Sequence, residues 1–337
     1  MPKLRSRIAG TGLGIPSKVL TNTDLEKIVE TSDEWIRTRT GIRERRFVDR
    51  DKGESLTSIS LQAAREALER AHLKPQDLDF VLCCTTTPDT VMPISAARIA
   101  GDLGCAQSTG ALDMNAACAG FISGLHMADG LIRGGIQKNV LVVGADVFSG
   151  ILDWTDRTTC VLFGDGCGAA IVQGFDSQDE SKDSMILGSK LYHVFDRDES
   201  LSIKGGGSRT PLHDPRYNKE HKPYLTMMGQ EVFKAGTRAM AQAGKEVVEL
   251  CGLKMTDIDW LVPHQANIRI IEMVGKLIEF PSERTYINVD RWGNTSAATI
   301  AICLAEMEQK GMLKKGQLLL LDVFGGGYTY GAMVVRW

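Results

Sequence analysis

The sequence predicts an α/β fold built from two similar halves. Segments typical of strands alternate with segments typical of helices along the 337 residues, and one short stretch recurs 180 positions later. Strands that alternate with helices indicate a largely parallel sheet with both faces covered. Hydrophobic residues make up 43% and charged residues 24% of the chain, as expected for a globular protein with a full core. The length allows about two domains.

The recurring stretch carries the pattern L-K-x-x-D-x-D, at residues 73–79 and again at residues 253–259. Each copy follows a segment with helical spacing of apolar residues and precedes a strand-like run. Because the offset of 180 residues is constant over this pattern, chance similarity between two unrelated βα units is the weaker explanation of the repeat.

The two halves continue in parallel beyond this stretch. Residues 112–115 lead into the small-residue turn 116–120, then a helical pattern and the apolar strand 140–143. Residues 287–290 lead in the same way into residues 293–296, a second helical pattern and the strand 318–321. We therefore predict a duplication of a unit of about 170–180 residues.

The stretch 174–224 departs from this order, since it is polar and holds three consecutive glycines, Pro211 and Pro215. Such composition is typical of connecting loops. We predict an N-terminal half at 1–173, connecting and excursion loops at 174–224, and a C-terminal half at 225–337.

Charge and cysteine content exclude several classes of protein. With 39 basic and 42 acidic residues the net charge is −3, which argues against a nucleic-acid partner held by a strong positive field. No apolar run reaches the 18 or more residues of a membrane helix, and no apolar segment follows the charged start as in a signal peptide. Eight cysteines without any C-x-x-C spacing exclude a zinc ribbon, and eight in 337 residues are too few for a disulfide scaffold. We expect a cytoplasmic protein with no membrane contact and no metal.

Cys118 is the candidate nucleophile. It lies in the turn Ala116-Ala117-Cys118-Ala119-Gly120, where small neighbours leave the thiol uncovered and a helix is predicted to begin. The N–H groups and dipole of a helix N-terminus lower a cysteine pKa and hold an oxyanion. A buried structural cysteine is the ordinary alternative at such a junction, and it is our reading of the seven other cysteines.

The second half supplies His264 and Asn294. His264 follows the predicted strand 260–262, and Asn294 lies at the junction that matches Cys118 in the duplication. Because ligands bind beyond the carboxyl ends of strands, packing of the halves about a pseudo-twofold axis would bring the three residues together. Papain-like proteases use the same three residue types, but their sequence signature around the cysteine is absent. Acyl transfer through a thioester, followed by formation of a carbon–carbon bond, fits the duplication better.

Of two glycine-rich segments, one is a candidate for binding a substrate oxygen and the other is not. Gly325, Gly326 and Gly327 follow the strand 318–323 and would let backbone N–H groups approach a substrate oxygen, within what is also a turn between strands. The early glycines of residues 10–14 suggest a dinucleotide loop, but their spacing is wrong and Pro16 interrupts the helix that should follow.

With these residues in place, the sequence resembles the β-ketoacyl-acyl-carrier-protein synthase III family over nearly its whole length. Seven motifs carry the resemblance, in chain order: TSDEWI with RTGIRER (31–45), AACAGF (116–121), FGDG (163–166), GQEVFK (229–234), VPHQAN (262–267), GNTSAA (293–298) and FGGG (324–327).

The resemblance implies a thiolase-like fold of αβαβα layers made from two duplicated halves, a homodimer, and a condensing reaction without a cofactor. A short acyl-CoA acylates Cys118, and malonyl-acyl-carrier protein then loses CO₂ to give an enolate that attacks the acyl thioester. His264 and Asn294 would stabilise the enolate oxygen, and the N–H groups of Cys118 and Gly326 would hold the acyl oxyanion.

The resemblance also implies where substrates bind. The residues that would contact CoA are Trp35, Arg39, Arg157, Phe233, Asn267 and Arg269. Lys234 and Arg269 would contact the acidic carrier protein, and Trp35 and Arg157 would flank the adenine, since both planes suit a π-face.

In many relatives, a bulky aromatic residue from the partner subunit limits the acyl pocket. The residue aligned with it in this chain is Met92. A flexible methionine leaves the length and branching of the acyl group open. A ketosynthase or acyltransferase of secondary metabolism with a longer acyl group is therefore the alternative, and a non-catalytic scaffold is a third hypothesis that the intact Cys118, His264 and Asn294 oppose.

Overall fold

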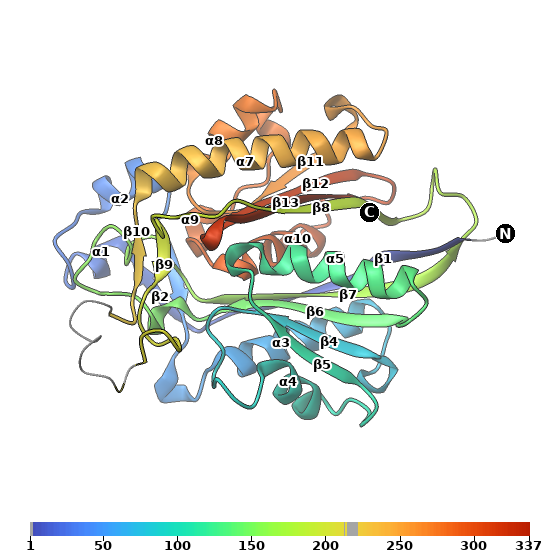
Figure 1. Ribbon diagram of the computed structural model, residues 1–337, viewed down its shortest axis with the longest axis horizontal. Coiled ribbons are helices and arrows are strands. Elements are labelled where there is room, and N and C mark those ends of the chain that lie inside the picture. Colours follow the sequence, from blue (N-terminus) through green and yellow to red (C-terminus); the bar gives the residue numbers. More distant parts are fainter. Residues whose placement is uncertain (1–2, 212, 214–221) are drawn as a thin grey trace.

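Two stacked β-sheets have one pair of helices between them and further helices outside, so the layers run helix, sheet, helix, sheet, helix (Figure 1). The structure is a computed structural model that describes residues 3–211, 213 and 222–337. The predicted α/β class is confirmed. In the described part of the chain, no helix is long and apolar enough to cross a membrane.

The first sheet has the strand order β1-β7-β6-β4-β5. Its strands are β1 (Lys3–Gly14), β4 (Phe80–Cys84), β5 (Gly110–Met114), β6 (Asn139–Asp146) and β7 (Gly166–Ser177). The second sheet has the order β11-β12-β13-β8. Its strands are β8 (Met185–His193), β11 (Trp260–Pro263), β12 (Leu318–Gly325) and β13 (Thr329–Arg336). The central strands therefore correspond in order: β4 to β11, β6 to β12, β7 to β13 and β1 to β8. The fifth strand of the second sheet is reduced to a single parallel bridge between Leu261 and Thr285.

The expectation of largely parallel sheets is wrong, because both sheets are mixed. β4 runs parallel to β5 and β6, and β11 runs parallel to β12, whereas β7, β13, β1 and β8 pair in antiparallel fashion. Only residues 326–328 join β12 to β13. A connection this short cannot make the crossover that a parallel pair requires.

Three hydrophobic cores hold the layers together, and their helices are α3 (Leu56–Arg70), α4 (Ser95–Leu103), α5 (Gly120–Arg133), α7 (Gly229–Leu250), α8 (Ile268–Leu277) and α10 (Thr299–Gln309). α5 and α10 fill the space between the sheets, and residues 299–307 of α10 are all buried. α3 and α4 cover the outer face of the first sheet, and α7 and α8 that of the second (Figure 1). A helix that is buried on every side is expected only in a central layer.

The repeated L-K-x-x-D-x-D pattern has a structural cause. In both copies the first aspartate, Asp77 or Asp257, accepts a hydrogen bond of 2.8 Å from the backbone N–H of the lysine three residues earlier. The second aspartate caps the start of the neighbouring strand: Asp79 accepts from Asn139 N at 2.8 Å and Asp259 from Leu318 N at 2.7 Å. The pattern thus aligns the same two strands in each half.

Residues 185–193, which we predicted to lie in connecting loops, instead form β8 and pair with β13. The assignment failed because the strand is only partly buried and follows a polar segment. The remaining short strands and α-helices are β2 (Lys18–Thr21), α1 (Asn22–Leu25), α2 (Asp33–Thr40), β3 (Glu44–Phe47), β9 (Leu201–Ile203), β10 (Leu225–Met227) and α9 (Val289–Trp292). Pro215 lies outside the described residues.

Candidate active site

Cys118 lies in a one-turn 3₁₀ segment, Ala117–Ala119, that leads from β5 directly into α5. Ala117 adopts a left-handed backbone with φ of 46°, which a side chain tolerates poorly. Ser296 has φ of 51° in the matching segment before α10. The two segments contact each other between the sheets. The prediction that the two junctions lie in contact is therefore confirmed.

His264 follows β11 and is 3% exposed. Its Nδ1 lies 2.7 Å from the Thr299 hydroxyl, which in turn lies 3.0 Å from the carbonyl oxygen of Ser296. The hydroxyl proton can serve only one of these acceptors. When it is donated to the Ser296 carbonyl, the hydroxyl oxygen accepts from Nδ1–H and Nε2 carries no proton. When it is donated to Nδ1, the imidazole carries its own proton on Nε2, and that N–H can donate to a ligand.

Asn294 is oriented by its backbone and side chain together. Its N–H donates to the Leu162 carbonyl at 2.9 Å, and its carbonyl accepts from Gly164 N at 3.0 Å. Its Oδ1 accepts from Ser296 N at 2.9 Å. Because the amide oxygen is engaged in this way, the Nδ2 group is the end left to donate into the cavity.

The glycine-rich loop packs against the nucleophile. A Cβ added to Gly325 would lie 2.9 Å from Cys118 N and 3.0 Å from Ala119 N, so only glycine fits there. The backbone N–H groups of Gly326 and of Cys118 itself lie near enough to the Cys118 sulfur to lower the pKa of the thiol. Two N–H donors therefore lie beside the sulfur, where an oxyanion hole for an acyl group would need them.

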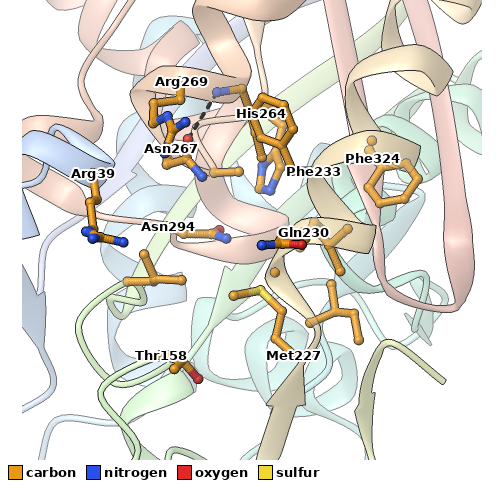
Figure 2. A pocket seen from close by; sticks show the side chains of 18 of the residues that line it. Arg39, Thr158, Met227, Gln230, Phe233, His264, Asn267, Arg269, Asn294 and Phe324 are labelled. Carbon is orange, nitrogen blue, oxygen red and sulfur yellow. Dashed lines mark hydrogen bonds between the residues drawn. The ribbon is translucent and has the colours of Figure 1, made fainter. Parts of the chain in front are cut away.

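Cys118, His264 and Asn294 line one cavity of about 620 Å³. Figure 2 shows the His264 ring and the Asn294 amide directed into the same space. Five of the six predicted CoA contacts, and Lys234, line this cavity too: Trp35, Arg39, Phe233, Asn267 and Arg269. A cluster of sequence-distant residues therefore shares one chamber.

The sixth predicted contact, Arg157, lies at the rim. Its guanidinium carbon is 5.0 Å from the centre of the Trp35 ring, and that of Arg39 is 4.8 Å away. An adenine inserted between Trp35 and Arg157 would need more room than this. Arg157 must therefore move to admit it. Arg269 contacts Phe233 similarly at 6.0 Å, while Asn267 caps α8 with its Oδ1 and keeps its amide N–H groups free.

A second cavity of about 490 Å³ also reaches Cys118 and Gly326. Its walls include the apolar side chains of Phe148, Phe163, Leu201, Ile203 and Leu225. Met92 lies in neither cavity and is 85% exposed, next to the 96% exposed Val91. Within one chain, Met92 therefore does not reach the site.

Burial dominates the ionisation of the two central groups. It raises the pKa of Cys118 to about 12, although hydrogen bonds from Ser296 and from the two backbone N–H groups lower it. The expectation that the helix N-terminus would give a lowered pKa is therefore wrong for the resting enzyme, and the thiol is protonated. Burial also lowers the pKa of His264 to about 3, so the imidazole is neutral.

Sequence reasoning missed three residues that contact or support this site: Ser296, Thr299 and Asp146. The Ser296 hydroxyl donates to the Cys118 sulfur at 3.5 Å. Asp146 ends β6 and is completely buried. The carboxyl end of that strand was a signal that could have flagged Asp146, whereas Ser296 and Thr299 had none beyond lying at or beside a motif.

Comparison with known proteins agrees with this geometry. The sequence models described as 3-oxoacyl-[acyl-carrier-protein] synthase III and as its C-terminal part match residues 112–193 and 248–337. A β-ketoacyl-[acyl-carrier-protein] synthase III of Caldanaerobacter subterraneus is 46% identical over 335 residues, which cover 99% of this chain and 98% of that protein. The chain belongs to the β-ketoacyl-acyl-carrier-protein synthase III family.

Solved structures place the fold in the same family. The 3-oxoacyl-[acyl-carrier-protein] synthase III of Aquifex aeolicus superimposes with a TM-score of 0.89 at 42% identity, covering 98% of this chain and 100% of that one. The priming β-ketosynthase of the R1128 polyketide pathway gives 0.90 at 32% identity, with coverage of 100% and 97%. The predicted thiolase-like fold is confirmed.

Proposed function

We propose that this synthase III condenses an acyl-CoA primer with malonyl-acyl-carrier protein, giving 3-oxoacyl-acyl-carrier protein, CO₂ and CoA at the start of fatty acid synthesis. The observation that carries the proposal is the single cavity shared by Cys118, His264 and Asn294. The higher identity to synthases III (46%) than to the polyketide priming enzyme (32%) favours this reaction over the alternative.

In the first half-reaction, the Cys118 sulfur attacks the thioester carbonyl of the acyl-CoA. The carbonyl oxygen becomes an oxyanion, which the N–H groups of Cys118 and Gly326 stabilise because both lie beside this sulfur. The bond to the CoA sulfur then breaks, CoA leaves as the thiol, and the acyl group remains on Cys118.

In the second half-reaction, the carboxylate of the malonyl group leaves as CO₂. The electron pair of the broken carbon–carbon bond forms an enolate, whose oxygen accepts hydrogen bonds from His264 Nε2–H and Asn294 Nδ2–H. The enolate carbon attacks the acyl carbonyl, and the Cys118 sulfur departs and takes up one proton from solvent to become the thiol again. A neutral imidazole suits this role, since it donates a proton-bearing nitrogen without needing to ionise.

The two cavities divide the substrates. We assign the larger one to CoA and then to the carrier-protein arm, held by Trp35, Arg39, Phe233, Asn267 and Arg269 inside and by Arg157 at the rim. We assign the apolar second cavity to the acyl chain. Lys234 and Arg269 at the mouth present the positive charge that an acidic carrier protein requires.

We further propose that the protein is a homodimer in the cytoplasm. β5 is an edge strand with exposed Leu112, and Val91 and Met92 project nearby from the loop after β4. Exposed apolar groups beside an unpaired strand edge favour pairing with a second copy, which would carry Met92 toward its partner's acyl cavity. All eight cysteines are free thiols, as a reducing compartment would keep them.

The division of the chain remains a proposal as well: a half at 1–173 with the nucleophile, a part at 174–224 that holds loops and also β8 of the second sheet, and a half at 225–337 with His264 and Asn294. Its support is the matching strand order of the two sheets.

A panel of acyl-CoAs tests the proposed reaction. Purified protein is incubated with acetyl, branched and long-chain acyl-CoAs, and intact mass records acylation before and after malonyl-acyl-carrier protein is added. Synthase III activity predicts rapid acylation by a short primer and its loss on condensation. Acylation by long chains alone would instead support the secondary-metabolism alternative, and no acylation by any of them would refute both.

A further inference from the structure

Cys118 has a second partner network that the proposed reaction does not use. The thiol is buried, and its polar side-chain contact is the Ser296 hydroxyl, 3.5 Å from the sulfur. Ser296 is itself fully buried and held by a left-handed backbone at φ of 51°. Such a conformation persists only where the surroundings enforce it, and here it points the hydroxyl at the nucleophile.

Asp146 lies next to this segment, and its two carboxyl oxygens have different hydrogen-bond partners. Oδ1 accepts four hydrogen bonds, from Thr85 Oγ1 at 3.0 Å, Thr86 N at 2.8 Å, Thr87 N at 3.2 Å and Thr87 Oγ1 at 2.9 Å. Oδ2 accepts one backbone bond, from Ala297 N at 3.2 Å. Ala297 follows Ser296, so Oδ2 is the oxygen on the Ser296 side. The Ser296 hydroxyl also lies close enough to this carboxyl to lower the pKa of Asp146.

We propose that Ser296 and Asp146 form the proton path for the Cys118 thiol during acylation. At rest the Ser296 hydroxyl donates to the sulfur, so it must first rotate toward Asp146 Oδ2. As the sulfur attacks the acyl-CoA carbonyl, the thiol proton then passes to the Ser296 oxygen while the Ser296 proton passes to Asp146 Oδ2. When the bond to CoA breaks, the same path runs in reverse and delivers a proton to the departing CoA sulfur. No proton is gained or lost overall. This inference rests on the proposed function and adds a catalytic residue, Ser296, and a positioning and proton-holding residue, Asp146.

The neighbourhood supports this assignment over the other candidates. A neutral thiol must lose its proton to attack, and His264 is paired with Thr299 through Nδ1 and assigned to the condensation step. The titratable side chains around Asp146 are the thiols of Cys83, Cys84, Cys118 and Cys167. Burial raises the pKa of Asp146, which makes its carboxylate a better proton acceptor than an exposed aspartate.

The test measures acylation by itself. Wild type, Ser296→Ala, Asp146→Asn and the double variant are mixed with acetyl-CoA, and the acyl-enzyme is followed by quenched-flow mass spectrometry from pH 5.5 to 9. Ser60→Ala is the matched control, because Ser60 is another fully buried serine whose hydroxyl contacts a thiol, that of Cys167 at 3.7 Å, away from the site. Condensation is then measured from each variant after it has been fully acylated by long incubation.

We expect Ser296→Ala to slow acylation about 10²-fold, the usual contribution of a positioned proton acceptor. Its remaining rate should rise with pH across the range, whereas the wild-type rate should be nearly flat. The double variant should be no slower than the slower single variant, because both residues serve one path. Condensation from the acylated enzyme should change less than acylation, and Ser60→Ala should match wild type in both.

Acylation by Ser296→Ala at the wild-type rate and with the wild-type pH profile would overturn the proton path while leaving the proposed function intact. Multiplicative losses in the double variant would overturn it as well, since independent effects would then explain both. If Asp146→Asn fails to fold, Ser296→Ala alone decides, because its small side chain supports no neighbouring strand. Failure of the wild type to be acylated would instead refute the proposed function.

Discussion

Replacing Thr299 with valine should slow condensation and leave acylation nearly unchanged. Valine has about the same shape as threonine, but it removes the hydroxyl that lies 2.7 Å from His264 Nδ1. With His264 only 3% exposed, water does not replace the lost partner. A buried polar group left without a hydrogen bond costs about 1–3 kcal/mol. The tautomer with its proton on Nε2 loses that stabilisation, so the enolate step should slow by about 5- to 150-fold.

The assay separates the two half-reactions. Intact mass follows acylation by acetyl-CoA, and release of CO₂ from labelled malonyl-acyl-carrier protein follows decarboxylation. Thr57→Val is the matched control, because the buried Thr57 hydroxyl has no hydrogen-bond partner among the described residues and its loss should be neutral. Wild-type decarboxylation by Thr299→Val, or an equal loss of both half-reactions, would show that Thr299 does not set the protonation of His264.

Two further variants test other contacts of the structure. Gly325→Ala should slow acylation about 10²-fold, because its Cβ would lie 2.9 Å from Cys118 N and displace the nucleophile. Gly101→Ala is the control and should leave the acylation rate unchanged, because its Cβ would meet no atom within 4 Å. Equal acylation rates for the two variants would contradict the packing of Gly325 against Cys118. Glu306 is buried. Burial raises the pKa of its carboxyl, but hydrogen bonds from Arg291, Asn288 and Trp292 outweigh this effect and lower the pKa from an ordinary 4.5 to about 2. The contribution of Glu306 to the stability of the fold is therefore complete above pH 4.5 and is lost as the pH falls toward 2. Because the Arg291 side chain is 42% exposed and the glutamine oxygen still accepts hydrogen bonds, Glu306→Gln should lower the free energy of unfolding in urea at pH 7 by about 1–3 kcal/mol. It should also show a weaker loss of stability in acid, and an unchanged acid profile would contradict this.

The sequence predicted the arrangement best where local pattern and global topology coincide. The L-K-x-x-D-x-D repeat aligns equivalent strands in the two halves, so the duplication could be followed from Asp79 and Asp259 to the junctions that carry Cys118 and Asn294. The strand end before His264 was visible for the same reason. The predicted roles of these three residues remain proposals.

What the sequence did not contain is the environment that only packing creates. The residues of the turn around Cys118 do not indicate that burial raises the pKa of the thiol by more than the helix N-terminus lowers it. The partly buried β8 resembled a loop because its partner β13 lies far along the chain. Ser296 and Asp146 approach Cys118 from segments that are 178 and 28 residues away, so their contact with it depends on the finished fold.

The central claim is that Cys118 carries the acyl group. Its most direct measurement is the intact mass of the protein after incubation with acetyl-CoA, compared with that of Cys118→Ser under the same conditions. The account predicts one acetyl adduct of about 42 Da on the wild type, its release by malonyl-acyl-carrier protein, and no thioester on the variant. Absence of the adduct on the wild type, or an equal adduct on Cys118→Ser, would contradict it.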